Sequence, residues 1–433
     1  MIRRRQAGTR RSGAVLRRSQ QLERAGIAVL AAGALLTGTA VGAGPASAST
    51  FSWGGVTTVW AHGFDDVSTV TTDNGTVVAT WINHNDQLWY ATHRLDSPWS
   101  APTMVSGRAA ALAITKDGRG AWLLGQGFRS VFVVHVDPDG SLSQRKEIGA
   151  SGDPFISDAM ISVGAGGAVA AAWHGTSDVA RIAYRPAGGS WQKPDVVPQK
   201  GDLHGLVVGE AGTAQLVLAK AQPQNFRHQT ISYLRRSPEG TWAAPVTVAT
   251  KAWLTRAEGN PHGDLVVGWE VDKGDTHSLY ARYRPAEGGF KATRLLASNV
   301  PYGVYVALGI ADDGSAAAAY QATDTGSRQI EVTRADSSGA WSRPETLSMT
   351  GYSYSLAANA DGGFVVSAQD GAGVQLAACS TAHACDAPQT NASTGYRYPS
   401  ISYGPGGTIT LVWGRGCKTE ECLPTSLVAQ RGK

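Results

Sequence analysis

Side chains that could bind or transform a ligand are concentrated in six short segments of this 433-residue sequence. Each segment feeds an apolar run and is richer in aromatic and polar side chains than that run. Aromatic rings pack against the apolar C–H faces of sugars, and neighbouring acids and hydroxyls can bind the surrounding sugar hydroxyls. The segments are 60–66, 149–158, 199–204, 298–305, 349–354 and 391–398.

The predicted ligand-binding residues come from four of these segments. An alternative interpretation is that the tyrosines only cover the core and leave their hydroxyls in water. The ligand expected is an extracellular glycan or protein, with no cofactor and no catalytic residue. The predicted binding residues are Asp65, Asp66, Tyr302, Tyr305, Tyr352, Tyr354, Arg397 and Tyr398.

Other catalytic patterns do not occur in the sequence. There is no G-x-S-x-G elbow, no H-E-x-x-H motif and no P-loop. The ten histidines are scattered singly. His62, His174 and His204 could come together in the fold, but each is expected to be a solvated loop residue, so no metal site is predicted.

All four cysteines lie near the C-terminal end of the sequence. Their close spacing predicts two local disulfides, Cys379–Cys385 and Cys417–Cys422, although four cysteines allow three connectivities. Zinc is the competing interpretation, with His383 inside the first pair, but C-x5-C and C-x4-C fit zinc ribbons poorly.

The elements that must position these side chains repeat along the chain. A turn glycine is followed six residues later by an anchor residue, usually a large apolar one, with an apolar run between them that is typical of a buried strand. The pairs are Gly75/Trp81, Gly118/Leu124, Gly167/Trp173, Gly212/Leu218, Gly263/Trp269, Gly314/Tyr320, Gly362/Ala368 and Gly407/Trp413.

A second repeated pattern, aromatic-x-x-Pro, follows most of these strand pairs. Proline cannot donate a hydrogen bond to a ladder, so the pattern predicts the outermost strand of each unit, with its aromatic ring packed inward. Leu142 and Phe290 keep the apolar residue without the proline, and Cys385 keeps the proline without the ring. The complete examples are Trp99/Pro102, Trp191/Pro194, Trp242/Pro245 and Trp341/Pro344.

Successive turn glycines lie 43 to 51 residues apart. Periods of about 40–50 residues with four short strands are typical of propeller blades. We therefore predict an all-β fold in which residues 49–433 form one β-propeller of eight four-stranded blades, with seven as the fallback. Residues 51–59, with Trp53 in the aromatic position, are expected to supply the outer strand of the last blade and so close the ring.

Units that end in GGSWQKP, EGTWAAP and SGAWSRP resemble the secreted BNR/sialidase-like propeller superfamily. The resemblance covers nearly all of residues 51–433 and implies a propeller. Asp336–Trp341 is one residue short of the Asp-box of these repeats, S-x-D-x-G-x-x-W. The segment Tyr396-Arg397-Tyr398-Pro399 is similar to the Y/F-R-I-P segment of active sialidases, but it opens the last unit instead of the first.

The resemblance implies one alternative function, a sialidase-like glycoside hydrolase. Such a site would take three arginines from Arg108, Arg256 and Arg397, a tyrosine from Tyr352 or Tyr354, and an acid. The acids available are Asp65, Asp66 and Glu270. Because the arginine segment is displaced, we predict a non-enzymatic member instead. A structural cell-surface scaffold is a further alternative.

The first 48 residues differ from the rest of the sequence. Eight arginines stand there against one acid, an apolar run follows from Ala25 to Ala43, and Ala46-Ser47-Ala48 ends the segment. This order predicts a secretory signal peptide over residues 1–48, with an uncleaved membrane anchor as the alternative. The remainder holds 30 basic and 33 acidic residues, so no nucleic-acid partner is expected. We expect a secreted monomer, with cell-surface association as an open alternative.

Overall fold

The computed structural model describes residues 54–62, 64–94, 97–106, 112–118, 120–127, 130–150, 158–174, 179–222, 225–274, 276–300, 304, 306–321, 329–351, 353–369, 373–380, 384–391, 396–415 and 426–432. In these ranges the regular structure is β-strand, apart from the short turn η1 (Pro405–Gly407). The described part of the chain is therefore all-β, as the sequence predicts.

The strands form seven antiparallel sheets, six with four strands and one with seven. The first three sheets in chain order are β2–β5, β6–β9 and β10–β13. Their strands are β2 (Phe64–Thr71), β3 (Val77–Asn83), β4 (Leu88–His93), β5 (Thr103–Ser106), β6 (Leu112–Lys116), β7 (Ala121–Gln126), β8 (Ser130–Val136), β9 (Lys146–Ala150), β10 (Asp158–Val163), β11 (Val169–His174), β12 (Val179–Arg185) and β13 (Asp195–Lys200).

The seven-stranded sheet comes next, followed by the last three four-stranded sheets. Its strands are β14 (Asp202–Val208), β15 (Ala214–Gln222), β16 (Asn225–Arg236), β17 (Val246–Gly259), β18 (Leu265–Asp272), β19 (His277–Arg284) and β20 (Arg294–Val300). The remaining strands are β21 (Ala307–Ile310), β22 (Ala316–Gln321), β23 (Gln329–Ala335), β24 (Glu345–Thr350), β25 (Ser353–Ala358), β26 (Gly363–Gln369), β27 (Val374–Ser380), β28 (Gln389–Asn391), β29 (Tyr396–Tyr403), β30 (Ile409–Arg415), β31 (Ser426–Gly432) and β1 (Thr57–Trp60).

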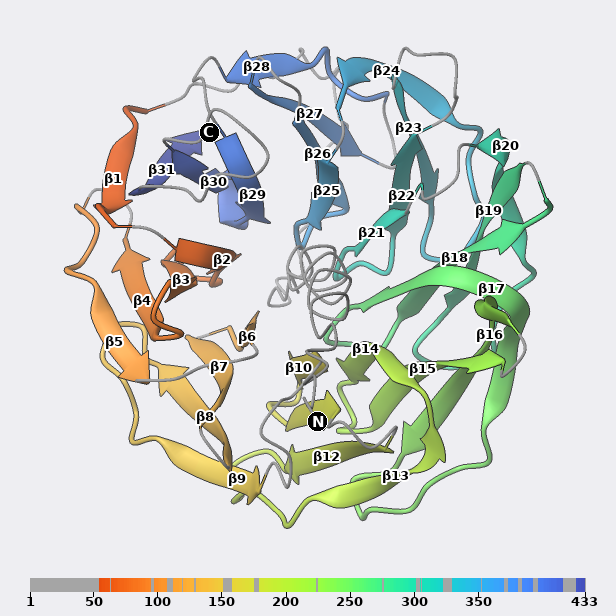
Figure 1. Ribbon diagram of the computed structural model, residues 1–433, viewed down its shortest axis with the longest axis horizontal. Helices are drawn as coiled ribbons and strands as arrows, with labels where there is room; N and C mark the ends of the chain where they lie inside the picture. Colours follow the sequence, from red (N-terminus) through yellow and green to blue (C-terminus); the bar gives the residue numbers. More distant parts are fainter. Residues whose placement is uncertain are drawn as a thin grey trace, which may run out of the picture.

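The sheets stand around a common axis (Figure 1). Strands such as β6, β10, β14 and β25 lie near the axis, and strands such as β5, β9, β13 and β28 lie on the outside. Apolar side chains from neighbouring sheets form the core between them, as in the cluster that joins Tyr184 and Ile182 of β12 to Leu206 and Leu216 of the next sheet. This arrangement is consistent with a β-propeller.

The predicted turn glycines are confirmed as a structural repeat. All eight have a positive φ, between 77° and 102°, which glycine adopts without the penalty that a Cβ brings. Each connects the innermost strand of a unit to the second strand. The eight anchor residues six positions later are all buried, including Trp81, Trp173, Trp269 and Trp413.

The proline of the aromatic-x-x-Pro pattern lies one residue before the strand to which the sequence analysis assigned it. It immediately precedes the outermost strand and is not part of it: Pro102, Pro194 and Pro344 come directly before β5, β13 and β24. A residue without an N–H can stand there because no ladder partner is required. The inward packing of the aromatic residue is confirmed, since Trp99 and Trp191 contact core clusters between sheets.

A backbone hydrogen bond recurs directly after the residue in the aromatic position of the aromatic-x-x-Pro pattern, in every unit. The N–H of the residue after it donates to a carbonyl of the third strand over 2.7–2.9 Å. Because one bond recurs at matching positions from one end of the chain to the other, the units share a structure and not only a pattern of residue types. The donors are Gly54, Ser100, Ser143, Gln192, Ala243, Lys291, Ser342 and Asp386.

Strand β17 differs from the other connections because it belongs to two units. Its first half pairs with β16 and its second half pairs with β18. The segment Val246–Gly259 holds no proline and no glycine before its last residue, so nothing interrupts the strand. Lys251, with a φ of 56°, lies at the change of direction. This continuity joins two four-stranded units into the seven-stranded sheet.

The two ends of the described chain lie in one sheet. Strand β1 pairs antiparallel with β31, and the order of this sheet is β1-β31-β30-β29. Its inner strand β29 is also hydrogen-bonded to β2 of the first sheet: Thr69 N donates to Ser400 Oγ over 3.1 Å, and Thr71 Oγ1 lies 2.7 Å from Ser402 Oγ. The outermost and innermost strands of the last sheet thus meet the beginning of the chain.

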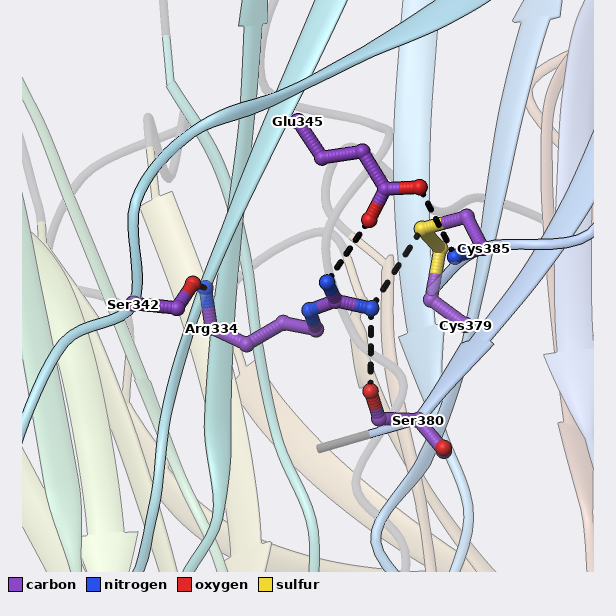
Figure 2. The surroundings of a disulfide bond; sticks show 6 residues. All are labelled: Arg334, Ser342, Glu345, Cys379, Ser380 and Cys385. Atoms are coloured by element: carbon purple, nitrogen blue, oxygen red, sulfur yellow. Dashed lines mark hydrogen bonds and ion pairs between the residues drawn. A yellow bond between two sulfur atoms is a disulfide. The ribbon is translucent and has the colours of Figure 1, made fainter. Parts of the chain in front are cut away.

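The predicted disulfide Cys379–Cys385 is present, with an S–S distance of 2.06 Å. Figure 2 shows that it lies beside Arg334 and Glu345 of the preceding sheet. Arg334 Nη2 donates to Glu345 Oε2 over 2.7 Å, Arg334 Nη1 donates to the Ser380 carbonyl over 3.0 Å, and Cys385 N donates to Glu345 Oε1 over 2.9 Å. Since Cys385 occupies the aromatic position, the disulfide stands where four of the other units place Trp99, Trp191, Trp242 or Trp341.

Two predictions about the covalent and targeting segments lie outside the described residues. These are the pair Cys417 and Cys422 and the signal segment 1–48. In the described part of the chain, no helix is long and apolar enough to cross a membrane.

Candidate functional site

Five of the six polar segments identified in the sequence join the outer strand of one sheet to the inner strand of the next, and the sixth leads from β1 into β2. Segment 149–158 links β9 to β10, and segment 199–204 links β13 to β14. In an antiparallel pair the first residue of the inner strand lies opposite the last residue of the second strand, as Asp158 lies opposite His174. We call the side of the molecule where inner strands begin and second strands end the entry face.

Four inner strands carry a β-bulge at their entry-face end. In β2 the register shifts between Phe64 and Asp66, and in β14 it shifts between Leu203 and Gly205. The inner half of β17 and strand β29 shift at Trp253/Arg256 and Arg397/Ser400. Bulges redirect side chains and are over-represented next to active sites. The regular pairing of these four inner strands is therefore interrupted at the entry face.

A buried group of three potential metal ligands lies on the entry face where two sheets meet. Asp158 begins β10, His174 ends β11 and Asp202 begins β14, and one donor atom from each lies within 4.8 Å of the others. Asp158 is 8% exposed and His174 is 4% exposed, whereas Asp202 is half-buried. The expectation that His174 is a solvated loop residue is therefore wrong, because β11 extends one residue beyond its tryptophan anchor.

A buried carboxyl–imidazole pair lies on the same face two units further along the chain. Glu270 lies near the end of β18, directly after the anchor Trp269, and its Oε1 contacts Nδ1 of His277 at the start of β19. Both side chains are nearly inaccessible, at 0% and 3% exposed. Trp253 of β17 pairs with Glu270 across the ladder and keeps part of its surface in solvent. Directly paired residues present their side chains on one face of a sheet, so an indole and a carboxyl stand together here.

The electrostatics of this pair favour a proton on it. Burial, aided by the charge of Asp272 and opposed by that of Arg227, raises the pKa of Glu270 to about 8. Burial also raises the pKa of Glu258, on the inner half of β17, to about 8 against the opposing charge of Arg256. Carboxyls that hold a proton near neutral pH can donate a hydrogen bond to a ligand oxygen, which ionised carboxylates cannot.

The predicted residues Asp65, Asp66, Arg397 and Tyr398 come together at the level of the backbone. They lie at the entry-face ends of β2 and β29, the two strands joined by the Thr69–Ser400 hydrogen bonds. Tyr302, Tyr305 and Tyr352 lie outside the described residues.

Tyr354 is placed differently from the expectation. It is 4% exposed and belongs to the core cluster between the sheet that begins at β21 and the sheet that begins at β25. Strand β25 already starts at Ser353, so alternation along the strand turns Tyr354 toward the neighbouring sheet. This burial corrects the expectation that Tyr354 offers a stacking face to a ligand.

The arginines required by the hydrolase alternative lie on separated strands. Arg256 is on β17 and is 8% exposed, with its Nη1 donating to the Thr255 carbonyl over 3.1 Å. Arg397 is on β29, and other sheets stand between β17 and β29 around the axis (Figure 1). Arg108 lies outside the described residues.

No protein-family model matches the chain, and no curated protein matches it in sequence. Solved structures do match in fold, and those similar to it are β-propeller proteins. The BP39L lectin from Burkholderia pseudomallei aligns with a TM-score of 0.53 and 12% identity, over 77% of this chain and 100% of the lectin. The fucose-specific lectin from Aleuria aurantia aligns with a TM-score of 0.40 and 13% identity, over 82% of this chain and 90% of that lectin.

A third match is the catalytically inactive virginiamycin B lyase from Staphylococcus aureus, with a TM-score of 0.44 and 10% identity, over 88% of this chain and 99% of the lyase. At 12% identity the BP39L lectin match shows a shared fold and nothing finer. Membership of a sialidase-like family is not supported by any of them.

Two entry-face residues that the sequence analysis named only within alternatives, His174 and Glu270, share a signal in the repeat. His174 and Glu270 each come directly after a buried tryptophan anchor, in the position seven residues after the turn glycine. That position also holds Gln321 and Gln369, whereas earlier units have Ile82 or Gly125 there. A polar residue in this register predicts a side chain near the entry face, because the second strand ends at this position or within three residues of it.

Proposed function

We propose that this chain is a secreted, carbohydrate-binding β-propeller whose sugar site lies on the entry face. The observation that carries the proposal is the juxtaposition of Trp253, Glu270 and His277 at that face. A partly exposed indole beside a buried, proton-bearing carboxyl supplies an apolar surface for the sugar ring and hydrogen-bonding groups for its hydroxyls. The likeness in fold to proteins named as lectins supports the same choice.

The architecture we propose is a ring of eight four-stranded blades. Counting β17 in two blades turns the seven-stranded sheet into two, so eight units of four strands account for the described strands. The pairing of β1 with β31 supports closure between the ends of the chain, and so does the Gly54 N to Arg431 O bond of 2.9 Å. In the last unit, that bond corresponds to the backbone hydrogen bond that the other units make directly after the aromatic position.

Within this proposal Asp65, Asp66, Arg397 and Tyr398 line a second part of the entry face, at the joint between the first and last blades. Tyr302, Tyr305 and Tyr352 are proposed to contribute aromatic surface from the segments between blades. The protein is proposed to act outside the cell as a monomer, as a binder and not as an enzyme.

The test is a glycan array probed with the purified protein, followed by affinity measurements on the glycans it selects. Trp253→Ala should weaken binding about tenfold, the loss expected when one aromatic stacking face is removed. Trp191→Ala is the matched control, because Trp191 is also half-buried but packs at the outer side of its unit. It should leave affinity unchanged wherever the variant remains folded.

A fluorogenic glycoside panel run on the same preparation separates a binder from a hydrolase. Turnover by the parent protein that Arg397→Ala abolishes would contradict the non-enzymatic assignment and favour the sialidase-like alternative. Absence of any glycan signal on the array, with the protein folded, would contradict the carbohydrate assignment.

A further inference from the structure

The group Asp158, His174 and Asp202 has the composition and geometry of a metal-binding site. Its donors are one imidazole nitrogen and two carboxylate oxygens, all within 4.8 Å of one another. Donor atoms around an ion with bonds of about 2.1 Å lie about 3–3.5 Å apart, so the three groups need to move by little more than an ångström to close on a cation. The group is independent of Trp253 and Glu270, which carry the proposed sugar site.

The three residues are held by three strands that cannot easily separate. Asp158 and His174 face each other across the β10–β11 ladder. Strand β14, which carries Asp202, is fixed beside β10 by a hydrogen bond of 3.0 Å from Val208 N to Ser162 Oγ. Leu203 of β14 is buried in the same core cluster as Ala170 and Ala172 of β11. Ligands on packed strands are more precisely held than ligands on loops.

The charge and the donor types point to one class of ion. Two carboxylate ligands and one imidazole ligand bring two negative charges to an ion, and a divalent cation balances them where Asp158 and His174 are removed from solvent. Ca²⁺ and Mg²⁺ prefer sites made only of oxygen, whereas an imidazole beside carboxylates suits Zn²⁺ and other first-row transition ions. We propose that Asp158, His174 and Asp202 bind one divalent first-row transition-metal ion, with Zn²⁺ as the reference ion.

Three protein ligands leave at least one coordination position for water or a ligand oxygen. Asp202 is the half-buried member, so that position is expected on its side of the group. This is the arrangement of a site that can take part in ligand binding, in contrast to a closed four-ligand structural site.

A second histidine of the chain provides an internal contrast. His135 Nε2 lies 2.6 Å from Asp117 Oδ2, and His135 Nδ1 lies 2.9 Å from Asp137 Oδ1. Burial alone would lower the pKa of His135, but the hydrogen bonds and charges of the two carboxylates outweigh it and raise that pKa. Its carboxylates approach opposite sides of the imidazole, so they cannot share one ion with it.

The experiment is calorimetric titration of untagged, metal-free protein with Zn²⁺, Mn²⁺ and Ca²⁺, in the absence of glycan. We expect one Zn²⁺ per chain, bound more tightly than Ca²⁺. His174→Gln and Asp202→Asn should each weaken Zn²⁺ binding at least tenfold, and Asp117→Asn should not change it. Because His174 is buried, Asp202→Asn is the decisive variant if His174→Gln fails to fold.

Three results would overturn the proposal. They are the absence of saturable Zn²⁺ binding, Zn²⁺ binding that Asp202→Asn leaves intact, and a preference for Ca²⁺ over Zn²⁺. Since no glycan is present, failure here leaves the carbohydrate proposal untouched, and loss of glycan binding in Trp253→Ala leaves the metal proposal untouched.

Discussion

Replacing Glu270 by Gln should change the pH dependence of stability in a defined direction. The folded-state pKa of Glu270 is raised to about 8 by burial, above the ordinary value of 4.5. A raised folded-state pKa means that the contribution to stability is fully present below about pH 4.5. It is lost as the pH rises toward and through 8, because the folded protein must then hold a buried carboxylate.

The magnitude follows from the same values. Each pH unit between the two pKa values corresponds to about 1.4 kcal/mol, which sets an upper bound of about 5 kcal/mol. The charge of Arg227 stabilises the ionised form and opposes the rise in pKa. We therefore expect the free energy of unfolding of the wild-type protein to fall by about 2–4 kcal/mol relative to that of Glu270→Gln between pH 5 and pH 9.

Denaturant unfolding followed by tryptophan fluorescence at several pH values measures this difference. Glu239→Gln is the control: Glu239 is exposed, and hydrogen bonding to Ser237 lowers its pKa, so its contribution changes only in acid. The difference in free energy of unfolding between Glu239→Gln and the wild-type protein should stay constant over pH 5–9. A constant difference for Glu270→Gln over the same range would refute the assignment of a buried, proton-bearing carboxyl.

Three other predictions concern ring closure, the disulfide region and export. Trp60 of β1 packs against Trp89 at 4.7 Å between ring centroids, so Trp60→Ala should cost about 2–4 kcal/mol by denaturant unfolding, and an unchanged midpoint would argue against closure. Arg334→Met and Glu345→Gln should each cost about 2–3 kcal/mol, and a double-mutant cycle should show coupling between them, whereas additive losses would mean that the ion pair contributes nothing. The mature protein should begin at Ser49 and contain no free thiol; intact mass and thiol titration check this, and a retained arginine-rich segment would count against it.

The repeat was predictable because its signals are local. A glycine is needed where the chain turns with positive φ, and an apolar residue six positions later is buried whatever the neighbouring blade contains. The proline of the aromatic-x-x-Pro pattern was assigned to the outer strand, although it comes just before that strand. The physical reason for the proline is the same in both places, so composition alone could not decide between them.

The candidate site was less predictable because it depends on register and on contacts between sheets. Asp158 and Asp202 belong to segments that the sequence interpretation identified, but the approach of β14 to β10 brings Asp202 close to His174. The prediction that no metal is bound rested on histidines standing alone in the sequence. Aromatic content suggested Tyr354 as a ligand-binding residue, whereas strand alternation buries it.

The most direct measurement of the central claim is a crystal structure of the protein with the glycan that it binds most tightly on an array. The account predicts a sugar ring against Trp253 on the entry face, with a hydroxyl within hydrogen-bonding distance of Glu270 or His277. A sugar bound at the outer strands or on the opposite face would contradict the account.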